Sequence, residues 1–201
     1  MAKKLFPDFK PYISMALTPM VLTGRLIKKQ KPDAKVVFIG PCAAKKLEAS
    51  RKSVRSDVDF VLTFEEVMGM FEAKGINLPQ VEADAPFEEG TANGRGFAVS
   101  GGVANAVKQC IQKEHPDKEV LIDSAEGLKN CRTMLMMAKA GKRNGYLLEG
   151  MACPGGCVAG AGTLQPVIKS SALVKKYTND AEKKLAFESE YLDNLDLLTK
   201  E

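Results

Sequence analysis

Apolar and polar positions along the chain follow a pattern that changes from helical spacing to short continuous runs and back. In residues 18–30, TPMVLTGRLIKKQ, apolar side chains recur at helical spacing behind Thr18, a possible N-cap, and Pro19, which suits a first helical position. Residues 34–40, AKVVFIG, instead form a continuous apolar run rich in β-branched side chains and ended by Gly40. Such a run is typical of a strand buried on both faces. This part of the chain therefore predicts a helix followed by a strand.

The same succession recurs downstream. Residues 58–63 predict a strand, and Thr63 with Glu66 predicts a capping box that starts a helix over residues 64–75. A strand-like start at 97 leads into a helix that ends near 114. Further strands are predicted at 119–124 and 144–153, and further helices at 125–142 and 171–198. Strands that alternate with helices indicate an α/β fold with mainly parallel sheets flanked by helices.

A long connector divides this pattern into two lobes. Residues 76–96 have no clear period and are rich in Gly, Pro and acidic residues, and a connector of this length is usually functional or interdomain. We expect a first α/β lobe over residues 1–80 and a second over 81–201, which includes the C-terminal helices. Together they would form one structural domain of a larger protein.

Charge and cysteine content narrow the function classes. The net charge of +4 is spread along the 201 residues with Lys and Arg interleaved among Asp and Glu, which favours solvated faces over a nucleic-acid stripe. There is no apolar run of about 18 residues for a membrane span, and the basic start has no apolar segment of a secretory signal behind it. Five cysteines without an export signal favour reduced thiols or metal ligands in the cytoplasm. The single histidine, His115, excludes a zinc site built mainly from imidazole.

Two cysteine motifs follow predicted strands. Pro41 and Cys42 come after the strand at 34–40, and Cys153 and Cys157 come after the strand at 144–153. In open α/β sheets ligands bind at the carboxyl ends of strands, so we expect these three thiols to converge if the lobes face one another. Three thiolates are one fewer than a 4Fe–4S cluster or a structural zinc usually takes.

Glycines around the second motif support a cluster site. Gly155, Gly156, Gly160 and Gly162 would allow close backbone approach and positive φ, and backbone N–H groups can donate to inorganic sulfide. The alternative from spacing alone is a tight loop with two buried thiols, because a lone C-x-x-x-C is a weak signal.

The remaining candidates are expected to be structural. Cys110 and Cys131 lie at apolar spacing within predicted helices, where a free cysteine packs like a small hydrophobic residue. His115 is expected in a solvated loop. The predicted helix at 125–142 also carries three methionines that we expect in the core: Met134, Met136 and Met137.

The two motifs together resemble a known family. GPCAAKKLE (40–48) and EGMACPGGCVAGAG (149–162) are similar to the second and third cysteine signatures of the iron-only (FeFe) hydrogenases, in the catalytic domain of the large subunit. SMALTPMVLTGRLIKK (14–29) and GFAVSGGVANAV (96–107) look like that family too. The resemblance runs from about Phe9 to Gln165 and implies the large-subunit fold.

The resemblance implies an H-cluster, in which a 4Fe–4S cubane is joined through a cysteine to a diiron unit carrying CO and cyanide. The reaction implied is the reversible interconversion of H2 with two protons and two electrons, with a ferredoxin-like domain or protein as electron partner. Glu48 would orient Lys45 or bind locally. The resemblance implies that Cys42 and Cys153 bind the cubane, with Pro41 beside Cys42, and that Cys157 binds the cubane and bridges to the diiron unit. Lys45 would hydrogen-bond a cyanide. Met151 and Ala152 would line the diiron pocket, and Pro154 would shape the loop.

Departures from the family pattern change what we expect of this chain. A T-S-C-C-P-like first signature would supply the fourth cubane ligand and a proton-relay cysteine, but residues 1–35 contain no cysteine. Gly40 stands where catalytic members usually have methionine, and GAGTLQP replaces a more common triple glycine. We therefore expect a truncated domain that is inactive alone. The alternatives are a sensory or assembly-related iron–sulfur relative and a non-redox α/β domain with buried thiols or a three-cysteine zinc.

Overall fold

The computed structural model describes residues 1–82 and 90–199. Within these residues the strands form two two-stranded sheets, and both pairs are parallel. The chain divides into two compact units, each of which contains one sheet. Unit 1 comprises Met1–Ala16, Gly90–Val158 and Val167–Ser189, and unit 2 comprises Leu17–Glu89, Ala159–Pro166 and Glu190–Glu201.

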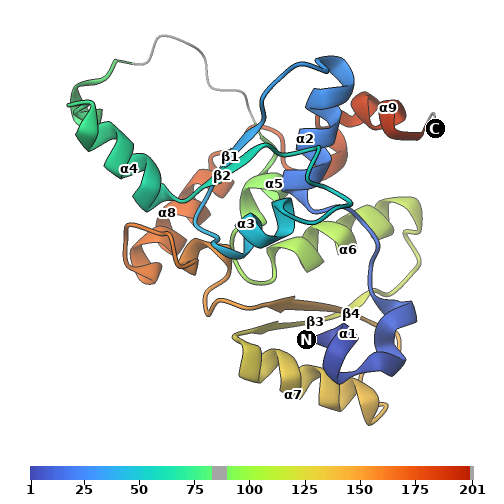
Figure 1. Ribbon diagram of the computed structural model, residues 1–201. Helices are drawn as coiled ribbons and strands as arrows, with labels where there is room; N and C mark the ends of the chain where they lie inside the picture. The colour runs from blue at the N-terminus through green and yellow to red at the C-terminus, as the bar shows by residue number, and fades with distance from the viewer. Residues whose placement is uncertain (83–89, 200–201) are drawn as a thin grey trace. The chain divides into compact units, whose positions relative to one another are not determined.

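Unit 1 is built on strands β3 (Leu121–Glu126) and β4 (Tyr146–Met151), which pair in parallel along their whole length. Helix α7 (Leu128–Lys139) connects them and covers one face of the sheet, whereas α6 (Gly102–Glu114) covers the other (Figure 1). The core of the unit forms where Ala125, Cys131 and Met134 pack together with Leu148. The other helices of this unit are α1 (Ala2–Leu5), η1 (Pro7–Tyr12), α5 (Ala92–Gly96), α8 (Val167–Asn179) and η4 (Ala186–Glu188).

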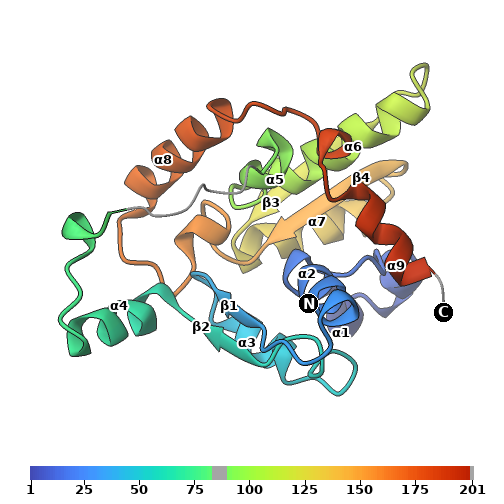
Figure 2. The ribbon, with the colours of Figure 1, turned by 90° about the horizontal axis from the view of Figure 1, so that it is seen from above.

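Unit 2 is built on strands β1 (Val37–Ile39) and β2 (Phe60–Leu62), with Val37 opposite Phe60. Its core forms where Met20 and Val21 of helix α2 (Pro19–Gln30) meet Val58. Figure 2 shows the two strands side by side with α3 (Ala44–Ala49) next to β2. The other helices are α4 (Phe64–Ala73), η2 (Leu78–Gln80), η5 (Leu192–Leu195) and α9 (Asp196–Thr199), and η3 (Cys157–Ala159) spans the step from unit 1 to unit 2.

The α/β class with parallel strands is confirmed, as are most of the predicted elements. The capping box at the start of α4 is also confirmed, because the Thr63 hydroxyl accepts from the Glu66 N–H at 3.3 Å and the Glu66 carboxylate accepts from the Thr63 N–H at 2.8 Å. The lobe boundary at residue 80 stays a prediction, and part of the connector, residues 83–89, lies outside the described residues. No helix in the described ranges is both long enough and apolar enough to span a membrane.

Three predictions about elements are wrong. The strand at 34–40 is not buried on both faces, because Val37 is 46% exposed and Ile39 49% exposed while Phe38 between them packs on the core of unit 2. Residues 97–100 form turns rather than a strand start. The C-terminal helix predicted at 171–198 is broken after Asn179 into short 3-10 and α segments.

Candidate functional site

The first cysteine motif lies on a short turn in unit 2, directly after β1. Cys42 is half-buried, and its carbonyl accepts the backbone N–H of Lys45 at 3.2 Å as α3 begins. Helix α3 has six residues and no side-chain cap at its N-terminus. The backbone therefore ties Lys45 to the turn that carries Cys42.

The Lys45 ammonium is held by a chain of side chains in unit 2. Its Nζ donates to Glu48 Oε2 at 2.6 Å, and the Thr18 hydroxyl donates to Glu48 Oε1 at 2.6 Å. The Lys45 and Glu48 side chains are 21% and 18% exposed, so the pair is largely removed from water. Glu48 therefore orients Lys45, as expected from the sequence.

Opposing effects act on the pKa of Glu48. Burial raises the pKa of this carboxyl, but the hydrogen bonds from Lys45 and Thr18, with the positive charges of Lys45 and Arg51, outweigh burial and hold the pKa below its ordinary value. Glu48 is therefore an anion at neutral pH, and Lys45 faces a fixed negative charge.

The second motif lies in unit 1, directly after β4. Cys153 is half-buried and Cys157 is exposed, and a turn between them is closed by the Gly156 N–H donating to the Cys153 carbonyl at 3.0 Å. Gly155 and Gly156 both have φ of +94°, a region that side-chain-bearing residues rarely adopt. A Cβ on Gly156 would also lie 2.6 Å from the Ser100 nitrogen. Glycine is therefore required by conformation and by space at this turn.

A carboxylate inside β4 braces the surroundings of this turn. Glu149 accepts the N–H of Gly101 at 2.6 Å and of Ala104 at 2.7 Å, so it caps the positive end of α6. The loop before α6 in turn meets the motif, because the Ala98 carbonyl accepts the Val158 N–H at 3.0 Å. Glu149 thus positions the loop against which the second motif packs.

The glycines after Cys157 pack against the first motif within unit 2. The Gly162 N–H donates to the Pro41 carbonyl at 2.9 Å, and both glycines are buried. A Cβ on Gly160 would overlap the Pro41 carbonyl, and one on Gly162 would overlap the Thr63 side chain. Neither residue has a positive φ, so here glycine is required by close approach alone. The Pro41 and Gly160–Gly162 contact is called the glycine link below.

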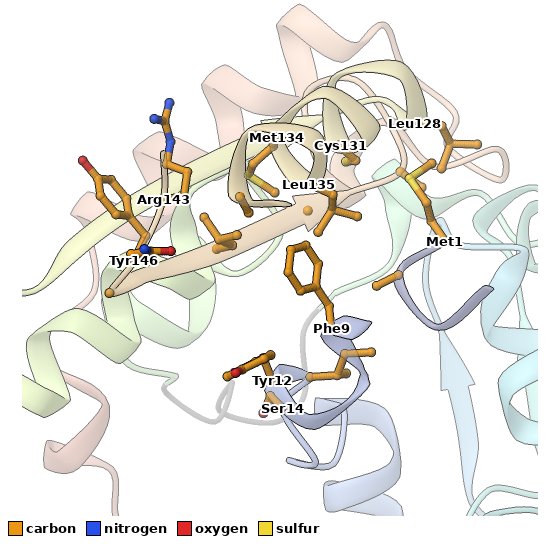
Figure 3. Close-up of a pocket in the computed structure, with 18 residues that line it drawn as sticks. Met1, Phe9, Tyr12, Ser14, Leu128, Cys131, Met134, Leu135, Arg143 and Tyr146 are labelled. Atoms are coloured by element: carbon orange, nitrogen blue, oxygen red, sulfur yellow. The ribbon is translucent and has the colours of Figure 1, made fainter. Parts of the chain in front are cut away.

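Unit 1 also contains a cavity of about 810 Å³ between its N-terminal segment and the β4–α7 layer. Figure 3 shows Phe9 and Tyr12 on one side and Leu135 and Met134 on the other. Cys131, Gly150 and Ala152 also line the cavity, so it extends to the residue before Cys153. Its wall is mainly apolar.

The residues expected to be structural are partly where the sequence predicts them. Cys131 is buried and its thiol donates to the carbonyls of Ala125 and Met151, at 3.4 and 3.5 Å, while burial raises the pKa of the thiol. Met134 is buried as predicted, but Met136 is 55% exposed, so its predicted place in the core is wrong. His115 is exposed at the end of α6, as expected.

The described residues fit part of an iron–sulfur cluster site. All five cysteines are described and none is in a disulfide, and the thiols of Cys42, Cys153 and Cys157 are the soft ligands that such clusters take. Unit 2 carries Cys42, whereas unit 1 carries Cys153 and Cys157. Within residues 1–82 and 90–199, no group of three His, Cys, Asp or Glu side chains is placed to hold a single metal ion. The other predicted site residues belong to the same two motifs. Pro41 is half-buried, whereas Ala152 and Pro154 are exposed. Met151 is half-buried, and its carbonyl accepts the Gly127 N–H at 2.9 Å.

Sequence reasoning missed two residues of this region. Thr18 was predicted only as a helix cap, and no local pattern links it to a residue 30 positions away. Glu149 was not given a role, although a carboxylate within an apolar strand run is a signal that could have found it.

Comparisons with known proteins agree on one family. The family model described as iron only hydrogenase large subunit, C-terminal domain, matches residues 1–161. The chain is 30% identical to the periplasmic Fe hydrogenase large subunit of Nitratidesulfovibrio vulgaris, over 83% of this chain and 49% of that protein. It is 28% identical to the cytosolic Fe-S cluster assembly factor narfl of Danio rerio, over 82% of this chain and 52% of that protein. The chain therefore spans about half the length of these relatives.

Solved structures share the fold. A variant of the FeFe-hydrogenase HydA1 from Chlamydomonas reinhardtii superposes with a TM-score of 0.71 at 21% identity, over 97% of this chain and 68% of that one. An identity this low bears on the fold alone. The predicted large-subunit fold is thus confirmed.

Proposed function

The chain belongs to the family of the iron-only hydrogenase large subunit, C-terminal domain, and on that premise we propose that it binds an iron–sulfur cluster through Cys42, Cys153 and Cys157. The relatives support an iron–sulfur cofactor in general, since their names include both hydrogenases and iron–sulfur assembly factors. The thiols supply three of the four ligands that a 4Fe–4S cubane takes.

The glycine link is the observation that carries this proposal. Gly160 comes three residues after Cys157, and its backbone lies against the carbonyl of Pro41, which directly precedes Cys42. The segment that follows Cys157 in the sequence therefore packs, within unit 2, on the residue before Cys42. A pair of unrelated buried thiols would not need side-chain-free backbone at this contact.

We further propose that the cofactor of the whole protein is the H-cluster. Its diiron unit would supply the interconversion of H2 with protons and electrons. Lys45 would donate a hydrogen bond to it, while Cys157 would bridge it to the cubane. Met151 and Ala152 would line its pocket, Pro154 would shape the loop, and Pro41 would lie beside Cys42. Electrons would come from a ferredoxin-like domain or protein, and we expect no turnover by this chain alone because three thiolates leave the cubane one ligand short.

A second candidate is an iron–sulfur domain with a sensory or assembly-related role and no fast catalysis. Gly40 favours this candidate, because the catalytic members of the hydrogenase family usually have methionine at this position. Here Gly40 is buried and the ring of Phe38 lies 2.8 Å from where a Cβ would stand. Several cytosolic assembly factors also match the chain. The cytoplasmic location expected from the cysteines stays a prediction, because a periplasmic hydrogenase matches as well.

Anaerobic reconstitution with iron and sulfide tests cluster binding. We expect about four iron and four sulfide per chain, and a marked loss in Cys42→Ser, Cys153→Ser and Cys157→Ser. Cys110→Ser, on helix α6, is the matched control and should retain the cluster. Full iron binding by all three ligand variants, or one zinc per chain without iron, would overturn the proposal. Infrared bands of CO and cyanide after maturation would select the H-cluster over the second candidate.

A further inference from the structure

The hydroxyl of Thr18 does not do what its place in the sequence predicts. Thr18 precedes Pro19 at the start of α2 and has the extended backbone of an N-cap, yet its side chain makes no capping hydrogen bond. The hydroxyl instead donates to Glu48 at 2.6 Å. A side chain suited to a helix cap is thus used to hold a carboxylate in α3.

Glu48 divides its two oxygens between two partners. Oε1 accepts from Thr18, and Oε2 accepts from the Lys45 ammonium at 2.6 Å. Because Thr18 fixes one oxygen, rotation of the carboxylate about its last torsion is restricted, and the position of the other oxygen is fixed as well. The ammonium of Lys45 is held on a six-residue helix that has no side-chain cap of its own.

The neighbouring Lys46 provides a contrast within the same helix. It forms an ion pair with Glu66, and those two side chains are 42% and 45% exposed, about twice the exposure of Lys45 and Glu48. That pair lies in solvent, where ion pairs contribute little. Of these two lysines, only Lys45, which follows the turn of Cys42, is held in a largely buried pair with a carboxylate that a third side chain fixes.

We propose that Thr18 is a positioning residue that acts through Glu48 to fix the Lys45 ammonium at the cluster site. The role of Lys45 toward a cofactor rests on the proposed function, but the positioning of its amine is a property of the metal-free chain. The two can therefore fail separately.

The experiment measures acylation of lysine amines in the full metal-free chain with an amine-reactive ester, read by mass spectrometry as the ratio of Lys45 to Lys46 labelling. Thr18→Val, which keeps the shape and removes the hydroxyl, should raise the ratio about fivefold, the factor for a hydrogen bond of ordinary net strength. Glu48→Gln should raise it about tenfold, the factor for losing the charge-assisted hydrogen bond that holds the amine. Thr18→Ser retains the hydroxyl and should restore the ratio of the unmodified protein.

A merely structural role for Thr18 would change both lysines together or neither. An unchanged ratio in Thr18→Val, or a raised ratio in Thr18→Ser, would therefore overturn the positioning role. Glu66→Gln is the matched control: because the Lys46–Glu66 pair is exposed, its loss should change labelling of Lys46 little and leave Lys45 unchanged. If the ratio responds as expected but reconstitution gives no cluster, the proposed function fails and the positioning role stands.

Discussion

Replacing Gly160 with alanine should disrupt the glycine link. A Cβ at this position would overlap the carbonyl carbon and oxygen of Pro41, and these are backbone atoms that cannot rotate aside. The segment must then move away, which breaks the hydrogen bond from Gly162 N–H to the Pro41 carbonyl, 2.9 Å in the unmodified chain. The φ of Gly160 is not positive, so the whole effect comes from space.

The expected cost follows from two contributions. Overpacking at a close contact costs typically 1–3 kcal/mol and a lost backbone hydrogen bond about 1 kcal/mol, so Gly160→Ala should lower the free energy of unfolding by about 2–4 kcal/mol. Urea unfolding followed by circular dichroism measures this change. A domain of ordinary stability, about 5–15 kcal/mol, stays folded at low temperature after such a loss. Iron binding can therefore be measured on the folded variant, and we expect it to fall as well.

Gly69→Ala is the matched control for this experiment. Gly69 lies within α4, with nothing within 4 Å of where its Cβ would stand. Alanine there should stabilise the chain by about 0.5–1 kcal/mol through helix propensity. If Gly160→Ala unfolds within about 0.5 kcal/mol of the unmodified protein and binds iron fully, the glycine link does not constrain the site and the reasoning is refuted.

Four further predictions follow from single side chains. Because the pKa of Glu48 is lowered on folding, its ionised form stabilises the chain above pH 4.5, and this contribution should disappear as the pH falls below that value; stability against pH, compared with Glu48→Gln, measures it. Glu149→Gln should cost about 1–2 kcal/mol in urea unfolding, since it removes the charge at the start of α6. Gly40→Met should cost about 1–3 kcal/mol by the same assay because of the nearby Phe38 ring, and no loss would contradict the crowding. Cys131→Ser should leave reconstituted iron unchanged, and a lost cluster would show that this buried thiol is a ligand.

Local signals carried most of the fold prediction. Thr63 and Glu66 lie three positions apart, so the capping box could be identified from the sequence and occurs as predicted. The exposure of Val37 and Ile39 could not be predicted, because it depends on what covers the second face of the sheet and not on the strand itself. The run at 97–100 has apolar residues but uses its Ala98 carbonyl to hold the second motif.

The candidate site likewise has features that local sequence predicts and features that depend on distant contacts. The cysteines and the need for glycine beside them follow from residue types and spacing. The reason differs between positions, however: Gly156 is required by its positive φ as well as by space, whereas Gly160 is required only by a neighbour more than a hundred residues away in the chain. The contact between Thr18 and Glu48 is also nonlocal, and it competes with a local capping role that the sequence favours equally.

Backbone groups, more than side chains, hold the two motifs in place. The Cys42 carbonyl accepts from Lys45, the Cys153 carbonyl from Gly156, and the Pro41 carbonyl from Gly162. Main-chain hydrogen bonds of this kind do not engage the thiols of Cys42 and Cys153, so ligation need not break the contacts that shape the loops. By contrast, the thiol of Cys131 is already engaged with two carbonyls inside the core of unit 1. The proposed ligand thiols of Cys42 and Cys153 thus differ from the Cys131 thiol, which already contacts two carbonyls.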